Sequence, residues 1–305
     1  MDAPPGSTVT TTRGGSVTVD EERTRATVTG AASVTVMAGD RFRIEQALID
    51  ERWAVVVRGD TLRQKPGEAT VVDLVTGDSA QLDGTSDPPT VSGGTWALHG
   101  DTLVHATRGQ DGAYCLARRD LADGVEATGE VVYCAEDRHG FTNARVTDAG
   151  LGLMTFDDGR PSCRTVGVVD GSAVAPQAGV DECKGWELVP TRLGTIWSVI
   201  PKENELDVAH VYAAPATSSD SDPVDLGEAA AGSLVWCGDA AYFSRDSSRG
   251  APARLLRWTG GAKADVVYEA KGGRAFIDGP RCGGDRITIS VLAESGDQQL
   301  TARVS

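Results

Sequence analysis

The chain has 305 residues, 40% of them hydrophobic and 24% charged, enough for one large all-β domain or two ordinary domains with a substantial core. Its 29 basic and 44 acidic residues give a net charge of -15, which argues against nucleic acid and against docking on an anionic membrane surface. No apolar run of about 18 residues is present, so the sequence predicts no membrane-spanning helix and no direct membrane insertion.

The N-terminal residues have the composition of a linker. Residues 2–15 are rich in Ala, Pro, Gly, Ser and Thr, and the start at Met1 lacks the basic and apolar regions of a signal peptide. We therefore expect a flexible tether over residues 1–24 and a single domain over residues 25–305. The 24 Arg against 5 Lys are typical of a high-GC genome and indicate an actinobacterial cell-surface protein, such as a lipoprotein or the sensor head of a membrane protein.

From about residue 45 the chain consists of alternating β-branched runs separated by Gly and Asp. The runs fall into six units of roughly 38 to 55 residues, the period of propeller blades. The first three units contain 46–49, 53–57, 69–74 and 80–82; then 95–98, 102–106, 114–118 and 130–134; then 144–146, 151–156, 163–168 and a strand before Cys183. The last three contain 186–189, 195–200, 209–212 and 224–226; then 233–236, 241–244, 254–258 and 265–269; then 275–277, 286–291 and 299–304.

The sixth unit stops one strand short of four. A radial stack of sheets must protect its first and last edges, and a strand from the other terminus does so. The segments 26–29 and 33–37 are the candidates. We predict an all-β fold, a six-bladed β-propeller of four-stranded blades with the last blade closed by an N-terminal strand. The alternatives are seven blades, with residues 8 to 45 forming most of another, and a pair of β-sandwiches.

The six cysteines stand in register with these units. Cys115 and Cys163 lie in or at the start of a third strand, and Cys134 and Cys183 at the end of a fourth. Cys237 and Cys282 lie between the first and second strands of successive units. Antiparallel neighbours bring such positions close enough for a disulfide, so we predict the pairs Cys115–Cys134, Cys163–Cys183 and Cys237–Cys282. Disulfides imply an oxidising compartment, which predicts a secreted or cell-surface protein.

The loops that surround the mouth of a propeller channel supply the candidate binding residues. His139 follows Asp137 and Arg138 in one such loop, and a His beside a carboxylate can orient a ligand or act as a general base. Trp186 can stack on a sugar ring, although core packing is its commoner role. A further loop contributes Asp157, Asp158 and Arg160. Solvated turns explain the same polar residues.

The segment Thr155-Phe156-Asp157-Asp158-Gly159 resembles the start of the Asp-box turn of sialidases, but Ser162 stands where that motif has an aromatic residue. Inner-strand starts such as Thr95-Trp96-Ala97-Leu98 and Ser233-Leu234-Val235-Trp236 resemble the TolB-like class of bacterial extracytoplasmic propellers. This resemblance covers residues 45–305 and implies the fold and the compartment. It carries over no functional residue.

The sequence lacks the spacing of a zinc site, a phosphate loop, a dinucleotide fingerprint or a nucleophile elbow. We therefore predict no cofactor, no metal and no catalytic residue. The leading hypothesis is a non-catalytic module that binds a protein, peptide or glycan through its loop face. The alternatives are a hydrolase, lactonase or glycan-acting propeller enzyme with its active site at the channel mouth, and a purely structural scaffold.

Overall fold

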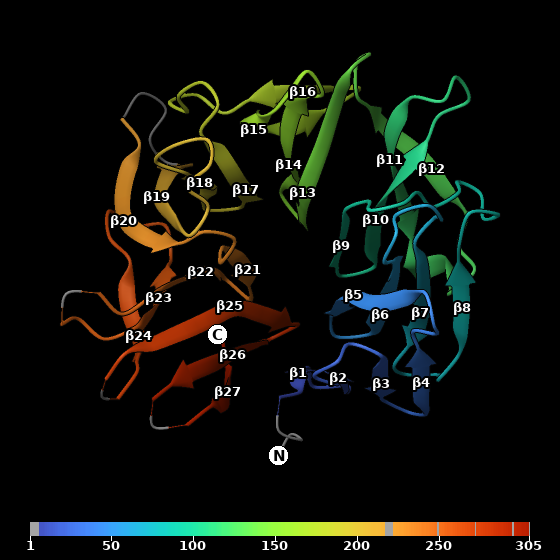
Figure 1. Cartoon of the computed structure of the whole chain (residues 1–305), viewed down its shortest axis with the longest axis horizontal. Helices are drawn as coiled ribbons and strands as arrows, with labels where there is room; N and C mark the ends of the chain where they lie inside the picture. The colour runs from blue at the N-terminus through green and yellow to red at the C-terminus, as the bar shows by residue number, and fades with distance from the viewer. Residues whose placement is uncertain (1–5, 217–221, 249, 272, 295, 305) are drawn as a thin grey trace. The chain divides into compact units, whose positions relative to one another are not determined.

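The computed structural model describes residues 6–216, 222–248, 250–271, 273–294 and 296–304, and within these ranges the fold is built from strands (Figure 1). The one helix in the described ranges is the 3₁₀ turn Leu121–Asp123, which Asp120 caps by accepting a hydrogen bond from the Ala122 amide. No helix in this part of the chain has the length and apolarity needed to cross a membrane.

The strands form antiparallel meanders, in which each strand pairs with the next along the chain. The first three meanders are β1 (Thr8–Thr11), β2 (Ser16–Val19), β3 (Arg25–Thr29) and β4 (Ser33–Met37); β5 (Phe42–Ile49), β6 (Trp53–Asp60), β7 (Glu68–Asp73) and β8 (Ser79–Leu82); and β9 (Trp96–His99), β10 (Thr102–Arg108), β11 (Tyr114–Asp120) and β12 (Gly129–Cys134).

The next three are β13 (His139–Thr147), β14 (Gly150–Asp157), β15 (Arg160–Asp170) and β16 (Ala173–Pro176); β17 (Gly185–Thr191), β18 (Gly194–Val199), β19 (Val208–Pro215) and β20 (Val224–Ala230); and β21 (Val235–Cys237), β22 (Ala240–Arg245), β23 (Arg254–Trp258) and β24 (Asp265–Glu269). The last meander is β25 (Ala275–Gly283), β26 (Arg286–Ala293) and β27 (Gln298–Arg303). The predicted fold class, an all-β propeller of four-stranded blades, is confirmed.

The chain divides into two compact units. The first contains Met1–Asp137, Gly171–Ala173 and Cys282–Arg286, and the second contains Arg138–Asp170, Val174–Arg281 and Ile287–Ser305.

The N-terminal strands differ from the expectation. The segments at 26–29 and 33–37 do form strands, but β3 and β4 pair with each other and, through β2, with β1. They do not complete the last meander. The tether expected over residues 1–24 is also wrong for residues 8–19, which lie in β1 and β2, because Val17 and Val19 alternate into the core and are buried.

The number of six blades is not confirmed. Five sheets have four strands, and within the first unit Gly283 at the end of β25 makes a parallel bridge to Ile49 of β5. The separate meander β1–β4 agrees with the alternative in which residues 8 to 45 form most of another blade.

The core of the first unit shows why its strands are so apolar. On β6, Ala54 and Val56 pack in one cluster with residues of β2 and β3, whereas Trp53, Val55 and Val57 pack in another with residues of β10. Successive side chains of a strand point to opposite faces, so a strand covered on both faces needs a continuous apolar run. Because these strands are covered on both faces, we expect polar functional residues in the connecting loops.

Candidate functional site

Disulfides fix the strand ends near which the candidate residues lie. In the first unit, Cys115 of β11 and Cys134 of β12 face each other in the strand register, and their sulfurs are bonded with the Cα atoms 3.9 Å apart. The second unit contains the Cys163–Cys183 disulfide, and Cys237 and Cys282 are also disulfide-bonded. Disulfides of this number indicate an oxidising, non-cytoplasmic compartment.

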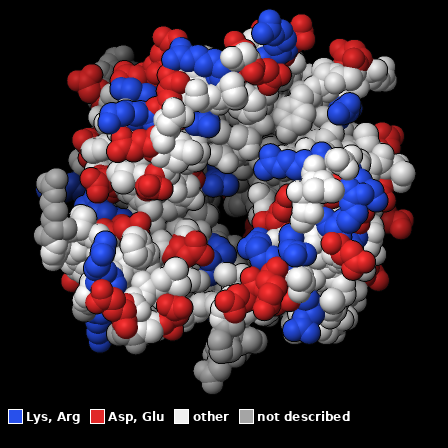
Figure 2. Space-filling model, viewed as in Figure 1, with Lys and Arg blue, Asp and Glu red and all other residues white. Residues whose placement is uncertain are grey.

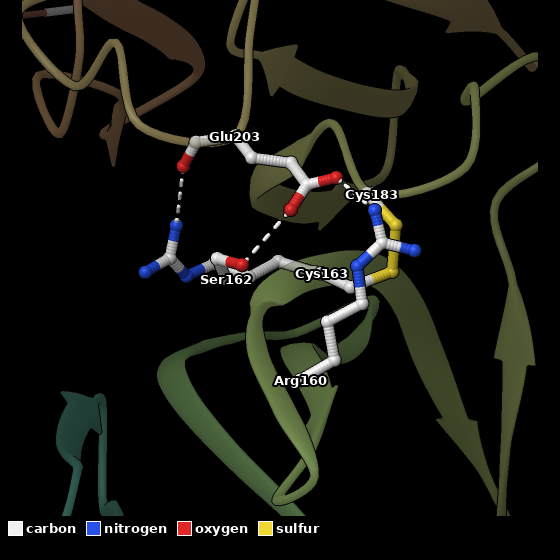
Figure 3. Close-up of a disulfide and its surroundings, with 6 residues drawn as sticks. Arg160, Ser162, Cys163, Cys183 and Glu203 are labelled. Carbon is white, nitrogen blue, oxygen red and sulfur yellow. Dashed lines mark hydrogen bonds and ion pairs between the residues drawn. A yellow bond between two sulfur atoms is a disulfide. The ribbon is translucent and has the colours of Figure 1, made fainter.

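The Cys163–Cys183 disulfide differs in one detail from the expectation. Cys163 lies near the start of β15, as predicted, but Cys183 follows β16 and lies in the connection to β17, with a backbone φ of 65°. Residues other than glycine rarely adopt this left-handed conformation, so the disulfide stabilises a turn that the sequence alone does not favour. The disulfide thereby joins the segment before Trp186 to β15 (Figure 3).

Glu203 is the centre of a polar cluster in the second unit (Figure 3). Its carboxylate pairs with the Arg160 guanidinium through Oε1 and accepts a hydrogen bond from Ser162 Oγ at 2.9 Å through Oε2. Its backbone carbonyl accepts a hydrogen bond from Arg164 Nη1 at 3.3 Å. Arg160, Ser162 and Arg164 are two residues apart on β15, so they point to one face of the strand. We call Arg160, Ser162, Arg164, Trp186 and Glu203 the Glu203 cluster.

Trp186 completes the cluster through its ring. The Arg164 guanidinium carbon lies 5.1 Å from the centroid of the Trp186 ring, a cation–π contact. The strand register between β17 and β18 shifts between Gly185 and Glu187, so Trp186 occupies a β-bulge. Bulges re-aim a side chain away from the regular alternation, and here the bulge aims the indole toward Arg164. Trp186 also packs partly against the apolar cluster that contains Leu188 and Trp197.

The residue after Trp186 anchors β17 in the core. Glu187 is 1% exposed, and its carboxylate pairs with the Arg145 guanidinium at 3.0 Å. It also accepts hydrogen bonds from Ser198 Oγ at 3.3 Å and from the Gly232 amide at 3.1 Å. Burial raises the pKa of Glu187, and the Arg145 charge acts in the opposite direction. These contacts of the buried Glu187 carboxylate fix β17, and with it the position of Trp186, against β13 and β18.

A shallow depression of about 440 Å³ adjoins the cluster and is lined by Lys202, Glu203, Asn204 and Glu205. Both signs of charge meet here, and Figure 2 shows Lys and Arg interspersed with Asp and Glu over the face in view. A surface of mixed charge provides donors and acceptors side by side, as polar peptide ligands require.

The structure brings only some of the predicted site residues together. Within the second unit, His139 at the start of β13 lies opposite Asp157 at the end of β14. The Asp158 amide donates to the Arg138 carbonyl at 2.8 Å, and Asp157 Oδ1 accepts from the Gly159 amide at 2.6 Å. Arg138, His139, Asp157 and Asp158 therefore share one strand end, and the Asp157 carboxylate caps the tight turn. Asp137 is exposed at the end of the first unit.

Arg160 and Trp186 belong to the Glu203 cluster, whose other members the sequence analysis does not select. Ser162 enters it only as the residue that breaks a motif, and Glu203 does not enter it. The period of two in Arg160, Ser162 and Arg164 was the available signal, because it places three polar side chains on one strand face.

One group of side chains in the described part of the chain has the spacing of metal ligands, namely Cys163, Glu182 and Cys183. Its two sulfurs are bonded to each other. A disulfide sulfur is not a thiolate, and zinc binds the thiolate form. We assign no metal to this group.

A scan of protein-family models finds no match to this chain, and a search of curated proteins finds none either. Solved structures are similar in fold. The β-propeller domain of the Trilobed protease from Pyrococcus furiosus, described as having an open velcro topology, is 10% identical with a TM-score of 0.59, over 97% of this chain and 95% of that one. YCF48 bound to D1 peptide is 11% identical with a TM-score of 0.57, over 100% and 94%.

Prolyl oligopeptidase B from Galerina marginata, bound to a 35mer hydrolysis and macrocyclization substrate, is 10% identical with a TM-score of 0.57. The match covers 95% of this chain but 46% of that enzyme, so this chain spans about half its length. At these identities the likeness shows the propeller fold alone.

Proposed function

We propose that this chain is an extracytoplasmic β-propeller that binds a protein or peptide ligand without catalysis, through the loops around the Glu203 cluster. The observation that carries the proposal is the cluster itself, in which two arginines, one carboxylate and one tryptophan are held at a loop end beside a disulfide. Arg and Trp are the residue types that dominate the energy of protein interfaces. The oxidising compartment indicated by the disulfides supports the extracytoplasmic part of the proposal.

Two features support a peptide over a glycan. One face of the Trp186 ring already carries the Arg164 guanidinium, which competes with a stacked sugar. The paired Arg160 and Glu203 provide a donor fork and an acceptor within one cluster, which suits a polar peptide backbone with charged side chains. The similar folds of YCF48 bound to D1 peptide and of a prolyl oligopeptidase bound to a peptide substrate are consistent with this choice.

The experiment selects peptides from a random phage-displayed library on the immobilised chain and measures their affinities by fluorescence polarisation. We expect Arg160→Ala and Trp186→Ala each to weaken the selected peptides by roughly tenfold or more, the effect of losing a good interface contact. Arg118→Ala is the matched control, because Arg118 is 55% exposed and paired with Glu130, whereas Arg160 is 57% exposed and paired with Glu203.

An affinity that Arg118→Ala reduces as much as Arg160→Ala does would show that general charge, and not the cluster, binds the peptides. Selected peptides that the chain hydrolyses on prolonged incubation would instead support the enzyme alternative.

A further inference from the structure

The last meander has an unusual outer edge. In the described residues β25–β27 has three strands, whereas each of the six other meanders has four. β27 is the outermost strand of its sheet. An edge strand presents a row of backbone N–H and C=O groups, which forms a template for pairing with another extended segment.

A cavity of about 220 Å³ lies beside this edge, within the second unit, between β22–β24 and β26–β27. Ile287 and Ile289 of β26 line it, together with the consecutive residues Leu300, Thr301, Ala302, Arg303 and Val304 in and after β27. The hydroxyl oxygens of Thr288 and Thr301 lie 3.1 Å apart, so β26 and β27 are in contact here.

The cavity lies between β24, the fourth strand of the neighbouring sheet, and β27, which in the described residues has no fourth strand beside it. Val267 of β24 lines the cavity and is 42% exposed. The cavity is smaller than the roughly 300–1,000 Å³ of pockets that hold a drug-sized ligand, so it suits one or two inserted side chains.

Two arginines line the cavity. Its lining includes Arg257 and Arg303 and no acidic residue, although the chain has 44 acidic residues. Arg257 Nε is buried without a hydrogen-bond partner in the described part of the structure, and its Nη2 is 4.0 Å from the Asp265 carboxylate. A carboxylate entering the cavity would therefore find a guanidinium with remaining donor capacity.

We propose that this edge is a second binding site, separate from the Glu203 cluster, for an extended peptide segment that carries an acidic residue two positions from an apolar one, so that both side chains point to the same face of the segment. The segment adds to β27 as a fourth strand through backbone hydrogen bonds, a known mode of peptide recognition. Its apolar side chain enters the cavity, and its carboxylate lies beside Arg257.

The probe is a fluorescent seven-residue peptide, capped at both ends, in which a leucine and a glutamate stand two positions apart and threonine and valine occupy the other positions. We expect saturable binding to the whole chain, measured by polarisation, and slower hydrogen exchange over residues 298–303 when the peptide is present. Two peptide controls separate the contributions. Methylation of alternate backbone amides removes the strand hydrogen bonds, and lysine in place of glutamate removes the carboxylate.

The protein variants are Ala302→Phe, which fills the cavity, and Arg257→Gln, which removes the charge. We expect each to weaken the probe by roughly tenfold or more. Arg160→Ala should leave this affinity unchanged, which distinguishes the site from the Glu203 cluster. If Ala302→Phe fails to fold, the affinity of Arg257→Gln for the probe and the hydrogen exchange of residues 298–303 test the proposal.

Three results would overturn the proposal: no saturable binding up to about 1 mM, equal binding of the methylated peptide, or a loss of affinity in Arg160→Ala but not in Arg257→Gln. A negative result at this edge does not affect the proposal for the Glu203 cluster, because the two sites are tested with different variants.

Discussion

His105 is a buried histidine whose surroundings define its protonation state. It is 0% exposed, and its ring stacks on Trp96 with centroids 5.0 Å apart. Nδ1 lies 3.0 Å from the Ala106 carbonyl, so it carries the proton, and Nε2 accepts from Arg119 Nε at 3.3 Å. Burial lowers the pKa of His105, the hydrogen bond to the Ala106 carbonyl opposes this and the Arg119 charge adds to it, so that the pKa is about 4. The neutral ring is therefore part of the folded state.

This histidine predicts a loss of stability in acid. The unfolded chain binds the proton near pH 6.5 and the folded chain only near pH 4, so the free energy of unfolding falls as the pH drops between these values. The difference corresponds to about 3 kcal/mol below pH 4. Denaturant unfolding of the wild type and His105→Gln at pH 7, 6, 5 and 4 measures it. The free energy should fall less steeply in the variant, and parallel curves would contradict the assignment.

The ion pair between buried Glu187 and half-buried Arg145 predicts an asymmetric response to substitution. Glu187→Ala leaves the Arg145 guanidinium and the Gly232 amide without this acceptor, so we expect a loss of about 1–3 kcal/mol of unfolding free energy. Glu187→Gln keeps the size and one acceptor oxygen and should lose less. The control is Glu130→Ala, whose side chain is 61% exposed and pairs with Arg118. It should cost under about 1 kcal/mol in the same denaturant titration, and a cost equal to that of Glu187→Ala would refute the argument from burial.

At the scale of elements, the Cys115–Cys134 bond connects the edge strand β12 to β11. Its 19-residue separation implies about 3 kcal/mol in the chain-entropy picture, or a melting temperature about 5–10 °C higher than without the bond. Cys134 is exposed, so Cys134→Ser removes the bond with little loss of packing. We expect the variant to melt at a lower temperature than the wild type under oxidising conditions. In reductant the two proteins should melt together. An equal difference in both conditions would mean that packing, and not the crosslink, is responsible.

Individual strands were predictable where a short run of apolar or β-branched residues lies between turn residues. The segments 254–258 and 265–269 match β23 and β24 at both ends, because apolar runs between glycine-rich turns define a strand locally. Pairing partners were less predictable. β4 has the expected bounds, yet it pairs with β3 and not with the last meander, since the alternation of a strand does not specify its neighbour. The Thr-rich β1 was missed because its composition is also that of a linker.

The candidate site was predictable only in part, for a related reason. Arg160 and Trp186 could be selected by residue type, but the contacts of Glu203 with Arg160, Ser162 and Arg164 join positions about 40 residues apart in the sequence. The contact of Trp186 with Arg164 depends on a β-bulge and on the turn at Cys183. Neither the bulge nor the positive φ has a signature in the sequence, because Gly and Asn are the usual residues at such positions.

At the scale of the whole molecule, the net charge of -15 predicts how stability responds to salt. Like charges repel one another more strongly in the compact state than in the unfolded chain, so unscreened charge destabilises the fold. The Debye length falls from about 30 Å at 0.01 M to about 8 Å at 0.15 M salt, which screens this repulsion over most of the surface. The exposed ion pairs weaken over the same range, but each contributes only about 0–1 kcal/mol.

We therefore expect the melting temperature at pH 7.5 to rise by a few degrees from about 0.01 M to 0.15 M NaCl. The control is the same pair of measurements near pH 4.7, the isoelectric point, where the net charge vanishes and the salt effect should disappear. A melting temperature that falls with salt at pH 7.5 would show that the ion pairs contribute more than the repulsion.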